Sequence, residues 1–215
     1  MSLELQAIDV TIQNSPILRK VSLTVGPGAR IGLIGRNGAG KTTIMRTIAG
    51  LAKPVSGEVL FDGKPITTLS PDQRAALGFG YMPEDRRLVP LLTVEENMLL
   101  PAWANKNIDA AHELSKVYDL MPELIEMKAR KALQLSGGQQ KLVALGRALI
   151  AGSRLLFLDE PFEGVAPALS ERLTEVIASL QDDKLSILIA QSELNHANKL
   201  LSGEYLIERG EIVTT

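Results

Sequence analysis

The stretch GRNGAGKT, residues 35–42, decides the fold class of this sequence. Residues 30–34 before it, RIGLI, are a short apolar run that predicts a buried strand. Residues 41–51 after it repeat apolar side chains at helical spacing, so they predict a helix. The stretch matches the pattern G-x-x-x-x-G-K-[ST] completely, and it stands between a strand and a helix as this phosphate-binding loop (P-loop) requires.

The chemistry of this pattern is the binding of a phosphate chain. Its glycines let backbone N–H groups turn toward the phosphates, and the start of the following helix favours an anion. Lys41 is expected to reach the β- and γ-phosphates, and the hydroxyl of Thr42 is expected to bind Mg²⁺. The alternative is a glycine-rich turn that binds nothing. The residues expected to contact a nucleotide here are Gly35, Arg36, Asn37, Gly38, Ala39, Gly40, Lys41, Thr42 and Thr43.

A second set of polar residues ends another apolar run. In LLFLDEP, residues 155–161, Asp159 and Glu160 follow four apolar residues. Two carboxylates beside a buried strand are unfavourable unless something satisfies their charge. A Mg²⁺ ion beside the P-loop satisfies Asp159, and Glu160 is then placed to polarise a water for in-line attack on the γ-phosphate. An ordinary polar strand end is the alternative.

The rest of the chain predicts alternating strands and helices. Residues 3–12 and 17–25 favour strands, and Asp62-Gly63 predicts a hairpin turn. The middle of the chain, roughly 92–135, is rich in Leu, Ala, Glu and Lys and predicts a mostly helical insertion with Thr93 as an N-cap. Further helices alternate with later strands, which implies a mainly parallel sheet.

The stretch LSGGQQ, residues 135–140, is a second glycine-rich start to a helix and therefore a second potential phosphate cradle. A plain N-cap by Ser136 explains the stretch about as well. One nucleotide needs only one P-loop. A second anion site on the same chain therefore hints at a site that another copy completes.

With these three motifs in this order, the sequence resembles an ATP-binding-cassette (ABC) ATPase over essentially its whole length. The stretches GYMPEDRRLVPLLTVEEN (80–97), LMPEL (120–124) and DEPFEGVAP (159–167) are similar to cassettes of branched-chain amino-acid importers and of urea and amide relatives. The resemblance implies an α/β fold of the P-loop NTPase class. It has a mainly parallel central sheet, an N-terminal antiparallel β subdomain and an inserted α-helical subdomain.

The resemblance also implies a division of the chain. Residues 1–215 are expected to form a single ABC ATPase domain. Its RecA-like core, together with the antiparallel β subdomain, is expected at 1–83 and 138–215. The helical subdomain is expected at 84–137, with the signature motif LSGGQ at its end.

The resemblance further implies partners and ligands. Two cassettes dock head to tail around ATP and Mg²⁺, and they drive transport through integral-membrane permease subunits, with a periplasmic or extracellular solute-binding protein as an indirect partner. The chain is then peripheral at the cytoplasmic face of the cell (inner) membrane. The solute is expected to be a branched-chain amino acid or a similar small polar molecule. The residues expected to contact the nucleotide of the second cassette are Ser136, Gly137, Gly138 and Gln139.

The expected metal site has three members. Glu84 occupies the place of a glutamine that, in most cassettes, bridges Mg²⁺ and the helical subdomain. It joins Thr42 and Asp159, and carboxylate oxygens suit a hard cation. The alternative for Glu84 is a solvated acid that balances Arg86 and Arg87.

Three positions depart from the family pattern. The loop after Glu160 usually ends in an aspartate, where this sequence has Ala166, as in the importer group that it resembles. Many cassettes stack adenine on an aromatic side chain near the end of the first strand, where this sequence has Thr11 and Ile12, so only apolar contact with Ile12 is expected. Gln191 stands where most cassettes have a histidine, and its amide can orient the attacking water but cannot carry a proton charge. His196 is interpreted as an ordinary histidine. The expected catalytic residues are Glu160, Lys41 and Gln191.

Composition narrows the function classes. Lys and Arg number 23 and Asp and Glu number 25, which gives a formal net charge of −2 and argues against a nucleic-acid partner. Cysteine is absent, which excludes disulfides and thiolate metal sites. Two alternatives to a transporter subunit remain. One is a nucleotide-gated cassette with little turnover, because of the unusual residues above, and the other is a soluble ABC ATPase outside transport.

Overall fold

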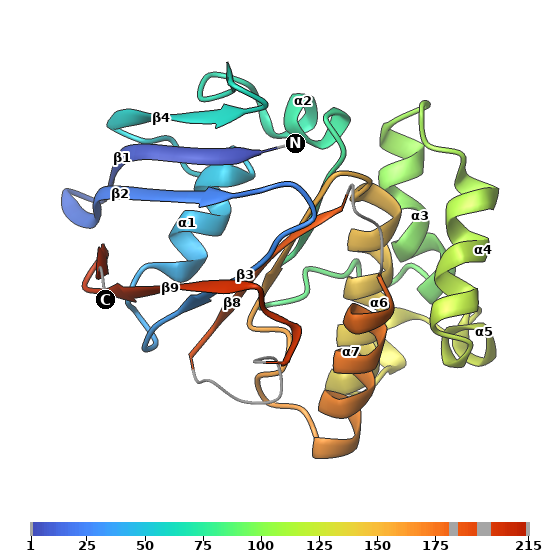
Figure 1. The fold of residues 1–215 in the computed structure, drawn as a ribbon. Coiled ribbons are helices and arrows are strands. Elements are labelled where there is room, and N and C mark those ends of the chain that lie inside the picture. The colour runs from blue at the N-terminus through green and yellow to red at the C-terminus, as the bar shows by residue number, and fades with distance from the viewer. Residues whose placement is uncertain (1, 181–184, 193–198, 214–215) are drawn as a thin grey trace.

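Two sheets lie on either side of helix α1 (Lys41–Ile48) in the computed structural model, which describes residues 2–180, 185–192 and 199–213 (Figure 1). The smaller sheet is antiparallel, with strand order β2-β1-β4-β5. Asp62 and Gly63 form the turn between its last two strands, both with positive φ, which confirms the predicted hairpin. The strands of this sheet are β1 (Leu3–Ile12), β2 (Ser15–Val25), β4 (Ser56–Phe61) and β5 (Lys64–Pro65).

The larger sheet carries the P-loop. Its order is β10-β9-β3-β8-β7-β6, and all neighbours are parallel except β9 and β10. The carboxyl ends of β3, β7 and β8 therefore meet at one edge, as the alternation of strands and helices predicted. The strands are β3 (Arg30–Ile34), β6 (Phe79–Met82), β7 (Leu155–Asp159), β8 (Ser186–Gln191), β9 (Gly203–Glu208) and β10 (Glu211–Val213).

Side-chain alternation along β8 separates two hydrophobic cores. Ile187 and Ile189 pack into a core with helices α6 (Gly137–Ala151) and α7 (Pro167–Ser179). Leu188 and Ala190 pack into the other core, which contains α1 and the antiparallel sheet. Because successive strand residues point to opposite faces, this alternation fixes the direction of any side chain that continues β8.

A group of helices lies beyond α6 at the edge of the molecule (Figure 1). Thr93 caps its first helix with a capping box: its hydroxyl accepts a hydrogen bond from the Glu96 N–H, and its own N–H donates to the Glu96 carboxylate. This confirms the predicted N-cap. All members lie within the predicted insertion 84–137, whose boundaries stay a prediction. They are α3 (Val94–Ala104), α4 (Ala110–Leu120), α5 (Glu123–Met127) and the short 3₁₀ helix η1 (Ala132–Gln134).

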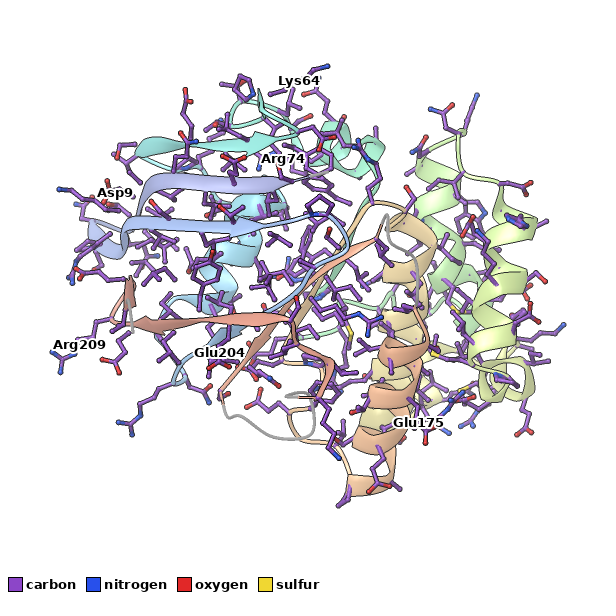
Figure 2. All side chains as sticks on the ribbon, in the orientation of Figure 1. Asp9, Lys64, Arg74, Glu175, Glu204 and Arg209 are labelled. Atoms are coloured by element: carbon purple, nitrogen blue, oxygen red, sulfur yellow. The ribbon has the colours of Figure 1, made fainter. Side chains whose placement is uncertain are left out.

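Helix α1 is held at its carboxyl end by a residue that the sequence did not single out. Arg74, from the short helix α2 (Pro71–Ala76), lies inside the molecule with 1% of its surface exposed (Figure 2). Its guanidinium donates to the carbonyls of Thr47 and Ile48, over 2.7 and 2.8 Å, and also to those of Thr67 and Leu69. These bonds satisfy carbonyls at the helix end and complement its dipole. The helix stops at Ile48, short of the predicted 51, where Gly50 takes a left-handed φ of 77°.

Candidate active site

The P-loop ends at the first turn of helix α1, which has no side-chain cap and borders a cavity. Gly40 is the N-cap of α1 with a φ of 114°, and a Cβ there would lie 2.8 Å from the Leu18 side chain, so only glycine fits. No side chain caps this helix, which leaves its first N–H groups directed toward an anion. The cavity measures about 420 Å³ and is lined by Ile17, Asn37, Gly38, Gly40, Lys41, Thr42, Thr43, Glu84 and Glu160.

Lys41 is held inside this cavity by three oxygen atoms. Its ammonium donates to the carbonyls of Gly35 and Arg36 over 2.6 and 3.2 Å, and it forms an ion pair with Glu160 at 3.0 Å. Both side chains of this pair are about 5% exposed, so little water screens it. The structure thus brings together two residues that are 119 positions apart in the sequence (160 − 41) and that were both expected to be catalytic.

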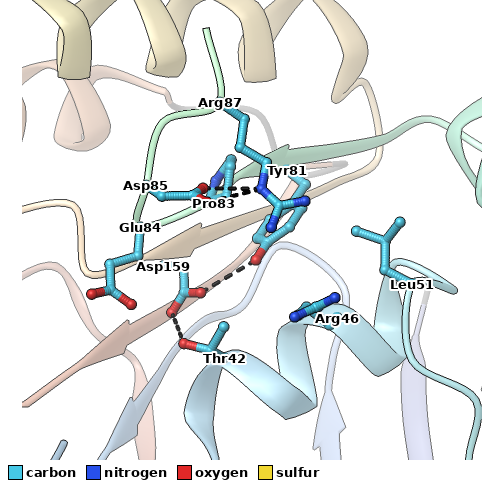
Figure 3. A pocket seen from close by; sticks show the side chains of 9 residues that line it. All are labelled: Thr42, Arg46, Leu51, Tyr81, Pro83, Glu84, Asp85, Arg87 and Asp159. Carbon is cyan, nitrogen blue, oxygen red and sulfur yellow. Dashed lines mark hydrogen bonds and ion pairs between the residues drawn. The ribbon is translucent and has the colours of Figure 1, made fainter.

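Asp159 is fully buried beside the P-loop helix. Thr42 donates its hydroxyl to one carboxylate oxygen over 3.3 Å, and the Tyr81 hydroxyl donates to the other over 3.2 Å (Figure 3). Burial raises the pKa of Asp159 to about 6, against these two hydrogen bonds, and the nearby carboxylates of Glu84 and Glu160 add to the rise. A buried carboxylate that faces other carboxylates suits a cation. The hydrogen bond from Tyr81 to Asp159 makes Tyr81 part of the site, although the sequence did not single it out.

Glu84 reaches the same place from the loop after β6. It lines the 420 Å³ cavity, and it also lines a neighbouring cavity of about 240 Å³ together with Thr42 and Asp159 (Figure 3). The oxygen atoms of these three residues are of the type that Mg²⁺ binds, with phosphates and water completing the set. The three residues expected to hold Mg²⁺ therefore line one cavity and have suitable ligand atoms, and the binding of the ion stays a prediction.

Arg147 fixes the loop that carries Glu84. Arg86 and Arg87 both adopt left-handed backbone, with φ of 61° and 47°, which costs free energy in a non-glycine residue. Arg147, on α6, donates its guanidinium to both of their carbonyls, over 2.5 and 2.7 Å. This second contact was also missed by sequence reasoning.

Glu160 adopts left-handed backbone, with a φ of 49°, and its carboxylate lies between the P-loop and the residue that follows β8. That residue is Ser192. Its hydroxyl donates to Glu160 Oε1 over 2.8 Å and its N–H donates to Oε2 over 3.1 Å, while its hydroxyl also lies 3.0 Å from Asn37 Oδ1. Sequence reasoning did not identify Ser192.

Gln191 was expected at this point, and the structure does not bring it there. Its side chain is 3% exposed, and neither end of its amide has a hydrogen-bond partner among the described residues. Gln191 continues the Ile187 and Ile189 face of β8, which packs on α6 and α7, whereas Ser192 continues the face toward α1. The structure therefore places Ser192, and not Gln191, beside Glu160, while the catalytic role expected for Gln191 stays a prediction. His196 lies outside the described residues.

The family model described as ABC transporter matches residues 18–163. The chain belongs to the ABC transporter family. The chain is 35% identical over 196 residues to the high-affinity branched-chain amino acid transport ATP-binding protein BraG of Pseudomonas aeruginosa, covering 91% of this chain and 84% of that protein. It is 32% identical over 201 residues to the lipopolysaccharide export system ATP-binding protein LptB of Haemophilus influenzae, covering 93% and 83%.

A solved structure of a nucleotide-free ATP-binding cassette from an ABC transporter superposes with a TM-score of 0.87. It is 28% identical and covers 100% of this chain and 90% of its own. The α/β cassette fold and the family that the motifs predicted are thus confirmed, and the chain is the ATPase subunit of a transporter. The names of these relatives give branched-chain amino acid transport for one and lipopolysaccharide export for the other, so the direction and the solute are left to the proposal below. No helix of the described part of this cassette is both long and apolar enough to span a membrane.

The signature stretch of the cassette lies at the start of α6. Ser136 caps this helix by accepting from the Gln139 N–H over 3.2 Å, and the Gln139 side chain accepts from the Ser136 N–H over 3.0 Å. Neither Ser136, Gly137, Gly138 nor Gln139 lines the two cavities beside the P-loop. Within one chain, the signature is therefore a capped helix start and contributes nothing to the walls of those cavities.

Ile12, expected against the adenine, is 44% exposed at the end of β1. Ile17 on β2, rather than Ile12, lines the P-loop cavity. Adenine contact by Ile12 stays a prediction, and Ile17 is a second apolar residue available to a base or ribose.

Proposed function

We propose that this cassette hydrolyses ATP with Glu160 as general base and Lys41 as the phosphate-binding cation. The observation that carries the proposal is that Lys41 and Glu160 form an ion pair in a cavity that Thr42 also lines, and that Thr42 in turn contacts Asp159. Glu160 accepts a proton from water as the water oxygen attacks the γ-phosphorus. The bond from that phosphorus to the bridging oxygen of ADP breaks, and Lys41 stabilises the charge that develops on the phosphate oxygens.

Thr42, Asp159 and Glu84 are proposed to hold Mg²⁺. Bound there, Mg²⁺ neutralises phosphate charge, which is the contribution metal ions make in phosphoryl transfer. Metal binding and proton acceptance are assigned to neighbouring residues. Asp159 lies on the α1 side of β7 next to Thr42, and Glu160, one residue later, contacts Lys41 and Ser192.

We infer that two cassettes act together, because the signature residues lie outside the P-loop cavities of their own chain. Ser136, Gly137, Gly138 and Gln139 of one copy then reach the nucleotide held by the other. Their helix start offers N–H groups to a phosphate if the Ser136 hydroxyl turns from the Gln139 N–H to the ligand.

The surface beside the Glu84 loop supports docking to an integral-membrane permease. Val89, Leu91 and Leu133 are 41%, 69% and 54% exposed, and the Leu133 N–H donates to the Pro90 carbonyl, so the two segments lie side by side. An apolar patch of this kind favours a protein partner. The proposed place of the cassette is thus peripheral, at the cytoplasmic face of the membrane.

The proposed transport is import of a branched-chain amino acid or a similar small polar solute, with a solute-binding protein as an indirect partner. The likeness to BraG at 35% identity and the motif stretches 80–97 and 159–167 support import. The likeness to LptB supports the opposite direction. Reconstitution with its permease into vesicles tests this: ATP-driven uptake of labelled leucine is expected, and ATP-driven release without uptake would overturn import.

Substitution of Glu160 tests the hydrolytic mechanism. Glu160→Gln is expected to lower kcat by about 100-fold or more while ATP binding is retained. Glu175→Gln is the matched control and is expected to keep the parent rate, because Glu175 is an exposed residue on α7 (Figure 2) that lines neither cavity. A parent-like rate in Glu160→Gln would exclude Glu160 as the base.

A further inference from the structure

Tyr81 holds one oxygen of the Asp159 carboxylate, although it is not among the residues expected to bind Mg²⁺. Its hydroxyl donates to Asp159 Oδ2 over 3.2 Å, while the hydroxyl of Thr42 donates to Oδ1 over 3.3 Å (Figure 3). The two oxygens thus have different partners, one from the sheet and one from the P-loop helix. Two directional hydrogen bonds on opposite oxygens fix the rotation of a carboxylate as well as its position.

The register of two neighbouring strands brings Tyr81 to Asp159. Tyr81 on β6 pairs with Phe157 on β7. Because side chains alternate along a strand, Phe157 and Asp159 point to the same face of the sheet. That face is the one toward α1, and Tyr81 packs on it too. The Tyr81 hydroxyl therefore reaches past Phe157 to the next residue of the same face.

A row of aromatic rings holds the Tyr81 ring in place. Its centroid lies 5.1 Å from that of Phe157. Phe157 contacts Phe79 edge to face at 6.0 Å, and Phe79 contacts Phe61 edge to face at 4.7 Å. The guanidinium of Arg154 lies over the Phe61 ring, 4.6 Å from its centroid. Such contacts favour defined ring orientations, so packing as well as hydrogen bonding fixes the direction of the Tyr81 hydroxyl.

Tyr81 is suited to donate a hydrogen bond rather than to bind a metal ion. A phenol is protonated at neutral pH and has one proton to donate. Mg²⁺ prefers carboxylate, phosphate and water oxygens. Tyr81 lines the 240 Å³ cavity together with Thr42, Glu84 and Asp159, so its hydroxyl lies beside the expected ligands.

We propose that Tyr81 is a positioning residue for the Mg²⁺ site, acting through its hydroxyl on Asp159. The inference rests on the proposed role of Asp159 as a metal ligand. With Oδ2 occupied by Tyr81, Oδ1 beside Thr42 is the oxygen directed to the cation. Carboxylates that bind metals are themselves hydrogen-bonded, and loss of such a bond weakens metal binding.

The test measures how much Mg²⁺ strengthens nucleotide binding by the full chain. The analogue β,γ-imido-ATP, which is not hydrolysed, is titrated calorimetrically in EDTA and in saturating Mg²⁺. In Tyr81→Phe the ratio of the two affinities is expected to fall about 10-fold or more below the parent ratio. The affinity in EDTA is expected to stay at the parent value, because the ring and its packing are kept.

Tyr118→Phe is the matched control, because it removes the same kind of hydrogen bond elsewhere. The Tyr118 hydroxyl donates to the Glu95 carboxylate over 2.7 Å, and neither residue lines the two cavities beside the P-loop. This variant is expected to keep the parent ratio of affinities.

Hydrolysis gives a second readout. In Tyr81→Phe the Mg²⁺ concentration for the half-maximal rate is expected to rise about 10-fold. The kcat at saturating Mg²⁺ is expected to stay close to the parent value, because the substitution leaves the proposed ligands and the proposed base in place.

Two outcomes for Tyr81→Phe would overturn the proposal. One is a parent-like ratio of affinities. The other is an equal loss of affinity with and without Mg²⁺, because the hydroxyl would then support the fold rather than the metal site. Asp159→Asn is measured in parallel, and a parent-like ratio there refutes Asp159 as a metal ligand. A lower ratio in Asp159→Asn with none in Tyr81→Phe refutes only the role of Tyr81.

Discussion

Replacing Asp159 by asparagine is expected to stabilise the nucleotide-free cassette while it abolishes Mg²⁺-dependent hydrolysis. The carboxylate is 0% exposed, and its pKa is raised from 3.8 to about 6, mainly by burial. Each pKa unit corresponds to about 1.4 kcal/mol. The charged carboxylate therefore costs the folded state about 3 kcal/mol above pH 6. Asparagine keeps polar atoms for Thr42 and Tyr81 but carries no charge.

The stabilisation has a defined pH window. The folded state holds the Asp159 proton more tightly than the unfolded state, so the free energy of unfolding falls as the pH rises from about 4 through about 6. As the pH rises through this range, the parent protein loses about 3 kcal/mol of its free energy of unfolding through Asp159. The Asp159→Asn variant has no carboxylate there and does not lose it. At pH 7.5 the variant is expected to unfold about 6–12 °C above the parent, at about 2–4 °C per kcal/mol for a chain of this size.

Thermal unfolding of both proteins without nucleotide, at pH 4.5 and at pH 7.5, measures the effect. The difference between the two proteins isolates the group, because other titrating residues are common to both. ATP hydrolysis with Mg²⁺ is measured in parallel and is expected to be lost in the variant. A variant that unfolds below the parent at pH 7.5, or a difference that is the same at both pH values, would refute the reasoning.

Three further substitutions test the remaining contacts. Gln191→Leu removes a buried amide without partners and is expected to raise the free energy of unfolding by about 1–3 kcal/mol with hydrolysis kept; loss of hydrolysis would return a catalytic role to Gln191. Arg147→Met removes two hydrogen bonds from the strained loop at 86–87. It is expected to lower the free energy of unfolding by about 2–4 kcal/mol and to raise the Mg²⁺ concentration needed for hydrolysis. An unchanged Mg²⁺ requirement would show that Arg147 does not position Glu84. Arg74→Met leaves buried carbonyls unsatisfied and is expected to lower the free energy of unfolding by about 3–5 kcal/mol, measured by urea unfolding. A loss below about 1 kcal/mol would contradict a stabilising role for the Arg74 hydrogen bonds.

The sequence predicted the residues whose chemistry is local. Lys41 and Thr42 lie in a contiguous loop, and Asp159 and Glu160 end one strand, so spacing alone identified them. The direction of Gln191 was also within reach, because Ile187 and Ile189 share its side of an alternating strand. All residues of β8 are buried and most are apolar, so the sequence alone does not show which of its residues share a face. The packing of α6 and α7 on one face and α1 on the other reveals it.

The residues that were missed act over long separations. Tyr81 meets Asp159 across 78 positions, and Arg147 meets the loop at 86–87 across about 60. A tyrosine after a short apolar run and an arginine inside a helix carry no local signal for such contacts. Arg74 is similar, since an arginine with only carbonyl partners resembles any surface arginine until its burial is known. Tertiary packing, rather than pattern, decides these positions.

Helix α6 connects the three parts of the mechanism. Ser136 caps its start, Lys141 donates to the Glu160 carbonyl over 2.7 Å, and Arg147 holds the loop that carries Glu84. Because Ser136 and Arg147 are 11 residues apart, about 16 Å of rigid helix separates the signature from that loop. In the proposed head-to-tail pair, a phosphate that binds the signature of one copy acts on the same helix that contacts the proposed base Glu160 and the loop of the proposed metal ligand Glu84. We therefore expect nucleotide contact at the signature and the placement of these two acids to be coupled through α6.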